Sequence, residues 1–78
     1  MIYALIYSND RKEVEKLEGE FLEFVPAKDL EDITKVAKRR LQDYGFKCCS
    51  IFSFDIWGMV SLKILDLEEE VFKILSRW

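Results

Sequence analysis

The carboxylates that could do chemistry in this chain occur in two close pairs. Asp29 and Asp32 stand three residues apart in a stretch with helical periodicity, and Glu20 and Glu23 have the same spacing beside a strand-like run. Two carboxylates together with water could hold Mg²⁺ for phosphodiester chemistry. Asp29 and Asp32 also stand where the start of a helix favours negative charge, and we interpret this pair as capping residues rather than metal ligands.

Other reactive residue types are few. The 78 residues include no histidine, which is the simplest general base near neutral pH, and the two cysteines, Cys48 and Cys49, are adjacent. Neighbouring side chains of a strand point to opposite faces, so these thiols are not placed to bond to each other, and no further soft ligand accompanies them. The sequence therefore predicts no catalytic residue, no metal site and no cofactor, and it favours a binding module over an enzyme.

One stretch of the chain is locally basic. With Tyr44 and Phe46 nearby, its cations could meet phosphates while a ring stacks on a base. The residues concerned are Lys35, Lys38, Arg39, Arg40 and Lys47. The formal net charge is −3 and the isoelectric point about 4.9, and basic residues also gather at helix C-termini for electrostatic reasons. A nucleic-acid-binding or metal-dependent nuclease-like subunit that uses the basic helix 35–40 is therefore the alternative function, and it is not the favoured one.

A second observation concerns the same region. In the stretch from Lys35 through Gly45 to Phe52, a helix reading KVAKRRLQDYG precedes a strand containing SIF. This pattern resembles the corresponding stretch of the small ferredoxin-like nucleases of CRISPR adaptation. That family carries an acidic residue at the end of its first strand, whereas the strand before this helix ends at residues 25–27 in Val, Pro and Ala. The resemblance therefore implies no site residue in this chain.

A small set of strands and helices must position these residues. Apolar runs and two-residue alternation predict strands at 2–7, 21–25, 46–54 and 59–65. Apolar residues three and four apart predict a helix from Leu30 to Tyr44, ended by Gly45, and a last helix from Leu67 to about Arg77. Residues 11–18 have a weaker pattern, which predicts a short helix or an ordered loop.

The order of these elements predicts one α+β domain over residues 1–78. We expect a two-layer sandwich in which a four-stranded antiparallel sheet carries two helices on one face, in the order ββαββα. This is the ferredoxin-like βαββαβ arrangement with its last strand moved to the front. Such a layout leaves the second face of the sheet uncovered in a monomer.

Strict alternation along the strands predicts which residues lie on that uncovered face. The rows expected to face the helices contain Phe46, Cys48, Phe52, Phe54, Val60, Leu62 and Ile64. The uncovered face would then carry Tyr3, Leu5, Tyr7, Cys49, Ile51, Met59 and Leu65. Because such an apolar face needs a cover, we expect two copies to associate face to face. Trp57, beside Gly58 in the hairpin tip, is a further predicted contact residue.

The predicted function is a small homo-oligomeric interaction or regulatory module. Its expected partner is a second copy, while another protein would use the same apolar surface. No run approaches the roughly 18 consecutive apolar residues of a membrane span, and Met1 leads into a strand without a basic leader, so we expect a cytoplasmic protein without a membrane partner. Charged residues make up 35% of the chain while Asn and Gln occur once each, a bias typical of heat-adapted proteins.

Overall fold

The fold is known from a computed structural model that describes residues 1–56 and 58–68. Its elements are β1 (Ile2–Ser8), α1 (Arg11–Glu15), β2 (Phe21–Pro26), α2 (Leu30–Tyr44), β3 (Cys48–Asp55) and β4 (Gly58–Asp66). The strands form one antiparallel sheet in the order β2-β1-β3-β4. The predicted α+β class, with a four-stranded antiparallel sheet and two helices, is confirmed. From residue 69 on, the predicted last helix lies outside the described residues.

β1 is a central strand that is buried on both faces. Its run of aromatic, aliphatic and β-branched residues is buried from Tyr3 to Ser8, as the unbroken apolar pattern predicts. β1 pairs with β2 along one edge and with β3 along the other. In the permuted ferredoxin-like arrangement the strand moved to the front would lie at an edge of the sheet. The central position of β1 therefore does not confirm that permutation.

The ends of α2 are fixed by the residues that the sequence indicates. The Asp29 side chain accepts a hydrogen bond from the Asp32 amide at 2.9 Å, and the Asp32 carboxylate accepts one from the Lys28 amide at 3.2 Å. Gly45 has a left-handed backbone (φ 78°), and its amide donates to the Leu41 carbonyl at 3.0 Å. The capping interpretation of Asp29 and Asp32 is thus confirmed.

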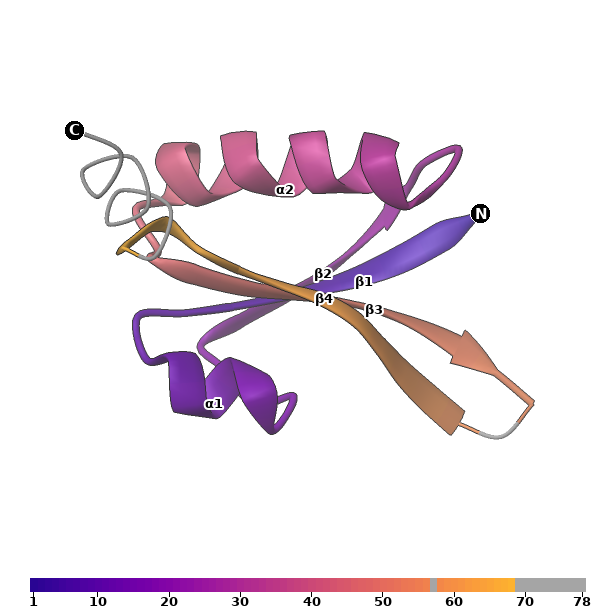
Figure 1. The fold of residues 1–78 in the computed structure, drawn as a ribbon, viewed down its shortest axis with the longest axis horizontal. Coiled ribbons are helices and arrows are strands. Elements are labelled where there is room, and N and C mark those ends of the chain that lie inside the picture. Colours follow the sequence, from indigo (N-terminus) through magenta and orange to yellow (C-terminus); the bar gives the residue numbers. More distant parts are fainter. Residues whose placement is uncertain (57, 69–78) are drawn as a thin grey trace, which may run out of the picture.

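The two described helices lie on opposite faces of the sheet (Figure 1). α2 packs on the face that carries Leu5, Tyr7 and Ile51, whereas Val14 of α1 packs on the face that carries Ala4 and Ile6. α1 has five residues and lies under one end of the sheet, away from the β3–β4 hairpin. The two helices predicted on one face were α2 and the last helix. The position of α1 on the opposite face was not predicted.

The predicted assignment of sheet faces is wrong for most of the uncovered row. The residues concerned lie in the core beneath α2, each at most 4% exposed: Tyr3, Leu5, Tyr7, Cys49, Ile51 and Leu65. The physical reason is that β1 and β3 each carry apolar side chains on both faces of the sheet. The apolar side of α2, which consists of Ile33, Ala37 and Leu41, packs on the face where the side chains of β3 are smaller. Phe52 and Phe54 of β3 lie on the opposite face, the one that α1 partly covers.

A β-bulge places Met59 on a different face from Leu65. The register of β3 and β4 shifts between Ile51 and Phe52, so that Lys63 lies opposite Ile51 while Ser61 lies opposite Phe52. The one extra residue in β4 reverses which face its later side chains take. Met59 consequently lies opposite Phe54, on the same side of the sheet as α1.

Candidate interaction surface

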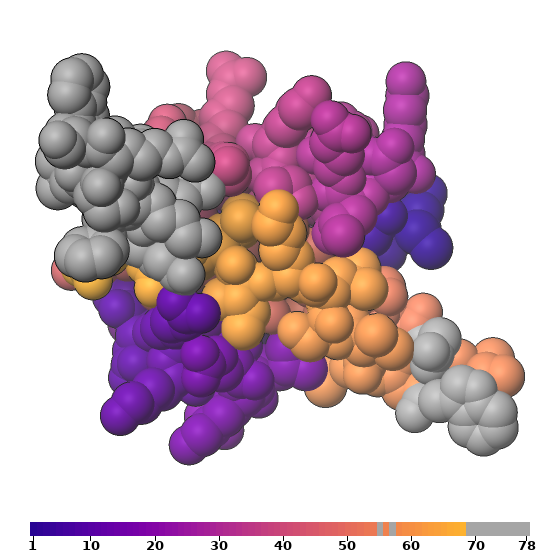
Figure 2. All heavy atoms as spheres, in the orientation of Figure 1, coloured from indigo at the N-terminus to yellow at the C-terminus, as the bar shows by residue number. Residues whose placement is uncertain are grey.

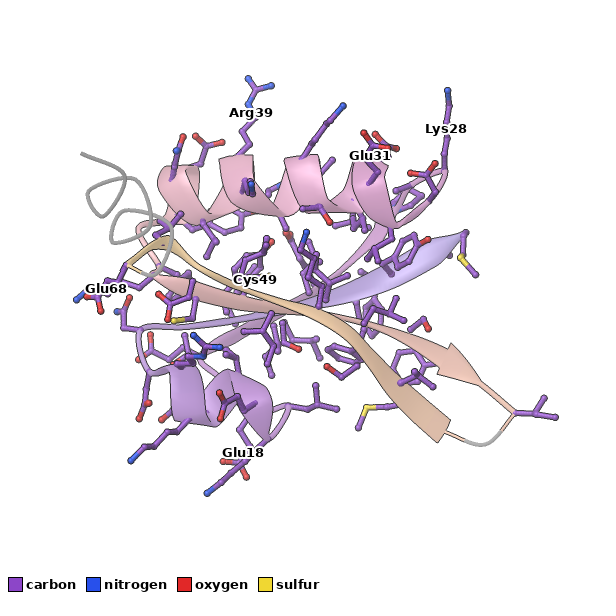
Figure 3. The ribbon with its side chains drawn as sticks, in the orientation of Figure 1. Glu18, Lys28, Glu31, Arg39, Cys49 and Glu68 are labelled. Atoms are coloured by element: carbon purple, nitrogen blue, oxygen red, sulfur yellow. The ribbon has the colours of Figure 1, made fainter. Side chains whose placement is uncertain are left out.

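The part of the sheet that α1 leaves uncovered carries large apolar side chains from all four strands. We call this surface the open face, and its residues are Ile2, Leu22, Phe24, Phe54 and Met59. Their exposed fractions run from 48% for Leu22 to 64% for Ile2. Figure 3 shows side chains projecting from this side of the sheet beyond the end of α1. The open face is therefore an apolar surface of a folded sheet.

The centre of the open face is aromatic. The ring centroids of Phe24 and Phe54 are 6.1 Å apart, and the ring of Phe52, which is 3% exposed, lies 5.7 Å from that of Phe54 in an edge-on arrangement. Ala4 of β1 lies opposite both Phe24 of β2 and Phe52 of β3, so only a methyl group stands between these two rings on β1. These ring contacts hold the exposed aromatic side chains in place before any partner binds.

The size of the open face can be compared with that of known interfaces. At about 200 Å² for a fully exposed large apolar side chain, the five exposures add up to about 550 Å². This is at the upper end of the roughly 300–600 Å² of the largest apolar patch on a typical monomer. Two copies that bury this patch against each other would remove about 1,100 Å², which passes the roughly 1,000 Å² expected of a specific interface.

The structure separates the predicted interface residues into three groups. Tyr3, Leu5, Tyr7, Cys49 and Ile51 are core residues, and a partner would reach them only if α2 left the sheet. The predicted contact residue in the open face is Met59, at 54% exposure. Trp57 lies outside the described residues.

Sequence reasoning missed four members of the open face, Ile2, Leu22, Phe24 and Phe54. The signal for two of them was present in β2, where Leu22 and Phe24 alternate with Glu23. An edge strand whose polar residue faces the helix presents its apolar row to the other side of the sheet. No corresponding signal marks Phe54, because both rows of β3 are apolar.

Both thiols are buried and free, so the cysteines are not reactive groups of this surface. Burial raises the pKa of Cys48 to about 11 and that of Cys49 to about 12. The side chain of Cys49, on β3, lies between α2 and the sheet (Figure 3). Both groups are therefore protonated at neutral pH and poor nucleophiles.

A polar network ties α2 to the edge strand β2. The Tyr7 hydroxyl donates to Glu23 Oε1 at 2.6 Å, and Arg40 contacts Glu23 Oε2 at 3.2 Å. Arg40 also donates to the Tyr44 hydroxyl at 2.7 Å, and the Tyr44 hydroxyl donates to Glu23 Oε2 at 3.1 Å. Burial and the bond to Glu23 raise the pKa of Tyr7. Arg40 thus contributes to the packing of the helix on the sheet.

The predicted nucleic-acid residues lie among acidic side chains. Lys35 pairs with Glu31 at 3.9 Å and Lys47 with Glu68 at 3.0 Å, in addition to the pair of Arg40 with Glu23. The bond to Glu68 raises the pKa of Lys47. Figure 3 shows Arg39 and Glu31 both pointing outward from α2, away from the sheet. Lys38 lies on the same helix. Along α2 the four bases follow Glu31 and Asp32 and precede Asp43, so acids stand at both ends of the basic run.

The carboxylates that suggested a metal are engaged within the fold. Asp29 and Asp32 accept hydrogen bonds from backbone amides, and Glu23 binds Tyr7 and Arg40. Within the described residues, no three His, Cys, Asp or Glu side chains lie close enough together to hold a metal ion.

No helix in residues 1–56 and 58–68 has the length and apolarity needed to cross a membrane.

Comparison with known proteins identifies no relative of this chain. No protein-family model, curated protein or solved structure matches it significantly. Its function is therefore inferred from its own surfaces.

Proposed function

We propose that this chain is a small interaction module that forms a homodimer through the open face. The observation that carries the proposal is the set of five exposed apolar side chains around the Phe24–Phe54 pair. An area of about 1,100 Å² is at the small end of the interfaces of specific complexes, whose affinity depends on packing quality as well as on area. Loss of translational and rotational freedom opposes association by about 4–15 kcal/mol, and side-chain ordering adds to that cost. The apolar area is therefore large enough to support a specific dimer.

Electrostatics permit a second copy as the occupant of the open face. Two identical chains that each carry a net charge of −3 repel each other, and a contact between them has to avoid charged surface. None of the five residues of the open face is charged, so this patch can meet itself across a two-fold axis without like charges facing each other. An uncharged, apolar patch of this kind can therefore pack against its own copy.

The nucleic-acid alternative has less support. Arg40 and Lys47 pair with carboxylates at 3.2 Å and 3.0 Å, and phosphate groups would have to displace these acids. The pair of Lys35 with Glu31, at 3.9 Å and largely exposed, is a weaker obstacle. A cytoplasmic location remains part of the proposal, because two buried free thiols suit a reducing compartment. A heat-adapted source remains a prediction from composition.

The proposal is tested by molar mass from light scattering behind size exclusion, with three single substitutions to glutamate. Phe24→Glu on β2 and Met59→Glu on β4 each place two charges in the proposed interface, and we expect dimer dissociation constants to rise by about 100-fold or more. Val60→Glu is the matched control, because Val60 neighbours Met59 but lies on the α2 face at 39% exposure. We expect it to leave the dimer intact. Circular dichroism of each variant verifies folding.

The pattern of the three variants distinguishes the possible contacts. If the copies pair along the free edge of β4 instead, Met59→Glu and Val60→Glu should both weaken the dimer while Phe24→Glu does not. A monomeric wild-type protein at high micromolar concentration would refute self-association altogether. A mass increase with a short DNA or RNA duplex that disappears at higher salt would favour the nucleic-acid alternative.

A further inference from the structure

A groove lies on the other side of the molecule, between the N-terminal half of α2 and the edge strand β4. α2 packs mainly on β3 and β1, and this leaves a hollow of about 410 Å³ along β4. Figure 2 shows this side, with β4 directly below α2 and facing the viewer. The groove is lined by Leu30, Glu31, Thr34, Lys35, Lys38 and Lys63. Its volume lies in the range of sites that take small organic ligands.

The rim of the groove is cationic in a chain that is otherwise acidic. Three lysines and one glutamate line it, so its formal charge is +2, while the whole chain carries −3. Lys35 is 3.9 Å from Glu31 in a pair whose side chains are 76% and 83% exposed, an arrangement that contributes little. Lys63, on β4, makes no ion pair with any described residue. Lys35 and Lys63 therefore offer ammonium groups from the two walls.

The floor of the groove is apolar. Leu30, one helical turn before the buried Thr34, is 38% exposed. Thr34 is 8% exposed, and its hydroxyl donates to the Leu30 carbonyl at 2.6 Å, so this polar group is already bonded within the fold. A ligand in the groove would meet aliphatic surface below and positive charge above. None of the lining residues is aromatic, so the groove has no ring on which a nucleobase could stack.

We propose that the α2–β4 groove binds a small soluble carboxylate with an aliphatic chain. Its carboxylate would lie between Lys35 and Lys63, and its chain would cover Leu30. Complementary charge and buried apolar area are the two contributions that such a site can supply. The proposal is independent of the homodimer, because the groove and the open face lie on opposite faces of the sheet.

Titration with octanoate, followed by ¹H–¹⁵N correlation spectra of the full chain, tests the proposal. We expect saturable shifts in residues 30–38 and around Lys63. Lys35→Gln and Lys63→Gln should each weaken binding by about two- to fivefold, the effect of losing an exposed ion pair. Lys12→Gln, on α1, is the matched control and should leave the affinity unchanged.

Three further probes separate the two features of the ligand. Acetate carries the charge without the chain, 1-octanol the chain without the charge, and octyltrimethylammonium the chain with the opposite charge. We expect each to bind more weakly than octanoate. Any of the three binding as tightly as octanoate would overturn the proposal, as would octanoate shifts confined to the open face.

Discussion

Removing one hydroxyl, in Tyr7→Phe, should lower the free energy of unfolding by about 1.5 kcal/mol. Tyr7 is fully buried, and its hydroxyl donates to the Glu23 carboxylate at 2.6 Å. Hydrogen bonds to charged groups contribute about 1.5–3 kcal/mol. Glu23 keeps its contacts with Arg40 and Tyr44, and its side chain is 16% exposed, so water replaces part of the lost bond. We therefore expect a value near the lower limit.

The substitution isolates the hydrogen bond because phenylalanine fills the same space. The ring of residue 7 contacts three aromatic rings, with centroid distances of 5.4–5.9 Å, and none of these contacts needs the hydroxyl. No cavity is created, so no packing loss adds to the effect. Tyr3→Phe is the matched control, since Tyr3 is buried at 4% exposure on the same strand and no bond from its hydroxyl joins it to Glu23.

The effect of Tyr7→Phe should also depend on pH in a known direction. Burial raises the pKa of Tyr7 above the ordinary value of about 10. The folded state therefore favours the protonated phenol, and this contribution to stability is complete below about pH 10 and is lost as the pH rises further. The variant lacks it, so the difference between wild type and variant should shrink above about pH 10. Cys48 and Cys49 titrate in both proteins and cancel in the comparison.

Urea denaturation followed by far-ultraviolet circular dichroism measures both effects. Wild type, Tyr7→Phe and Tyr3→Phe are compared at one protein concentration, because self-association would add to the apparent stability. The measurements are made at about pH 7 and about pH 11. A Tyr7→Phe protein within about 0.5 kcal/mol of wild type at neutral pH, or a difference that widens at alkaline pH, would refute the reasoning.

Three further predictions concern single residues. Gly19→Ala should lower the melting temperature more than Gly45→Ala, because a Cβ on Gly19 would lie 2.6 Å from a β1 carbonyl oxygen. A Cβ on Gly45 would meet open space, and the left-handed backbone there would cost an alanine about 1 kcal/mol. Asp29→Ala should destabilise by about 1 kcal/mol in urea denaturation through loss of the helix cap, and Asp29→Asn should restore most of it. Cys48 and Cys49 should react with iodoacetamide at neutral pH only in urea, because burial raises the pKa of both thiols; rapid labelling of the native protein would contradict this.

Local signals account for the parts of the fold that the sequence predicts correctly. The unbroken apolar run of β1 indicates a strand that is buried on both faces of the sheet, and β1 is buried on both faces. The limits of α2 follow from short-range chemistry, with a carboxylate at Asp29 and a left-handed glycine at Gly45. Each of these predictions depends on residues within a few positions of one another.

The predicted assignment of residues to sheet faces was wrong where it depends on packing between distant elements. Both rows of β3 are apolar, so only the docking of α2 decides that Ile51 is core and Phe54 is exposed. The bulge opposite Phe52 then moves Met59 to the side of Phe54, and nothing in the alternation of β4 marks that extra residue. How β3 pairs with β4 depends on the tertiary structure. A prediction from alternation assumes that the two strands pair without a bulge.

The two proposed surfaces should act independently, because they lie on opposite faces of one sheet. A dimer formed through the open face leaves both α2–β4 grooves on its outer sides, so we expect one octanoate bound per chain in the dimer. Phe24→Glu should convert the protein to a monomer without changing its octanoate affinity, and Lys63→Gln should weaken octanoate binding without changing the molar mass. If Phe24→Glu abolished octanoate binding in a folded protein, the ligand would bind in the dimer interface. The proposed octanoate site in the groove would then be wrong, and the proposed homodimer would be unaffected.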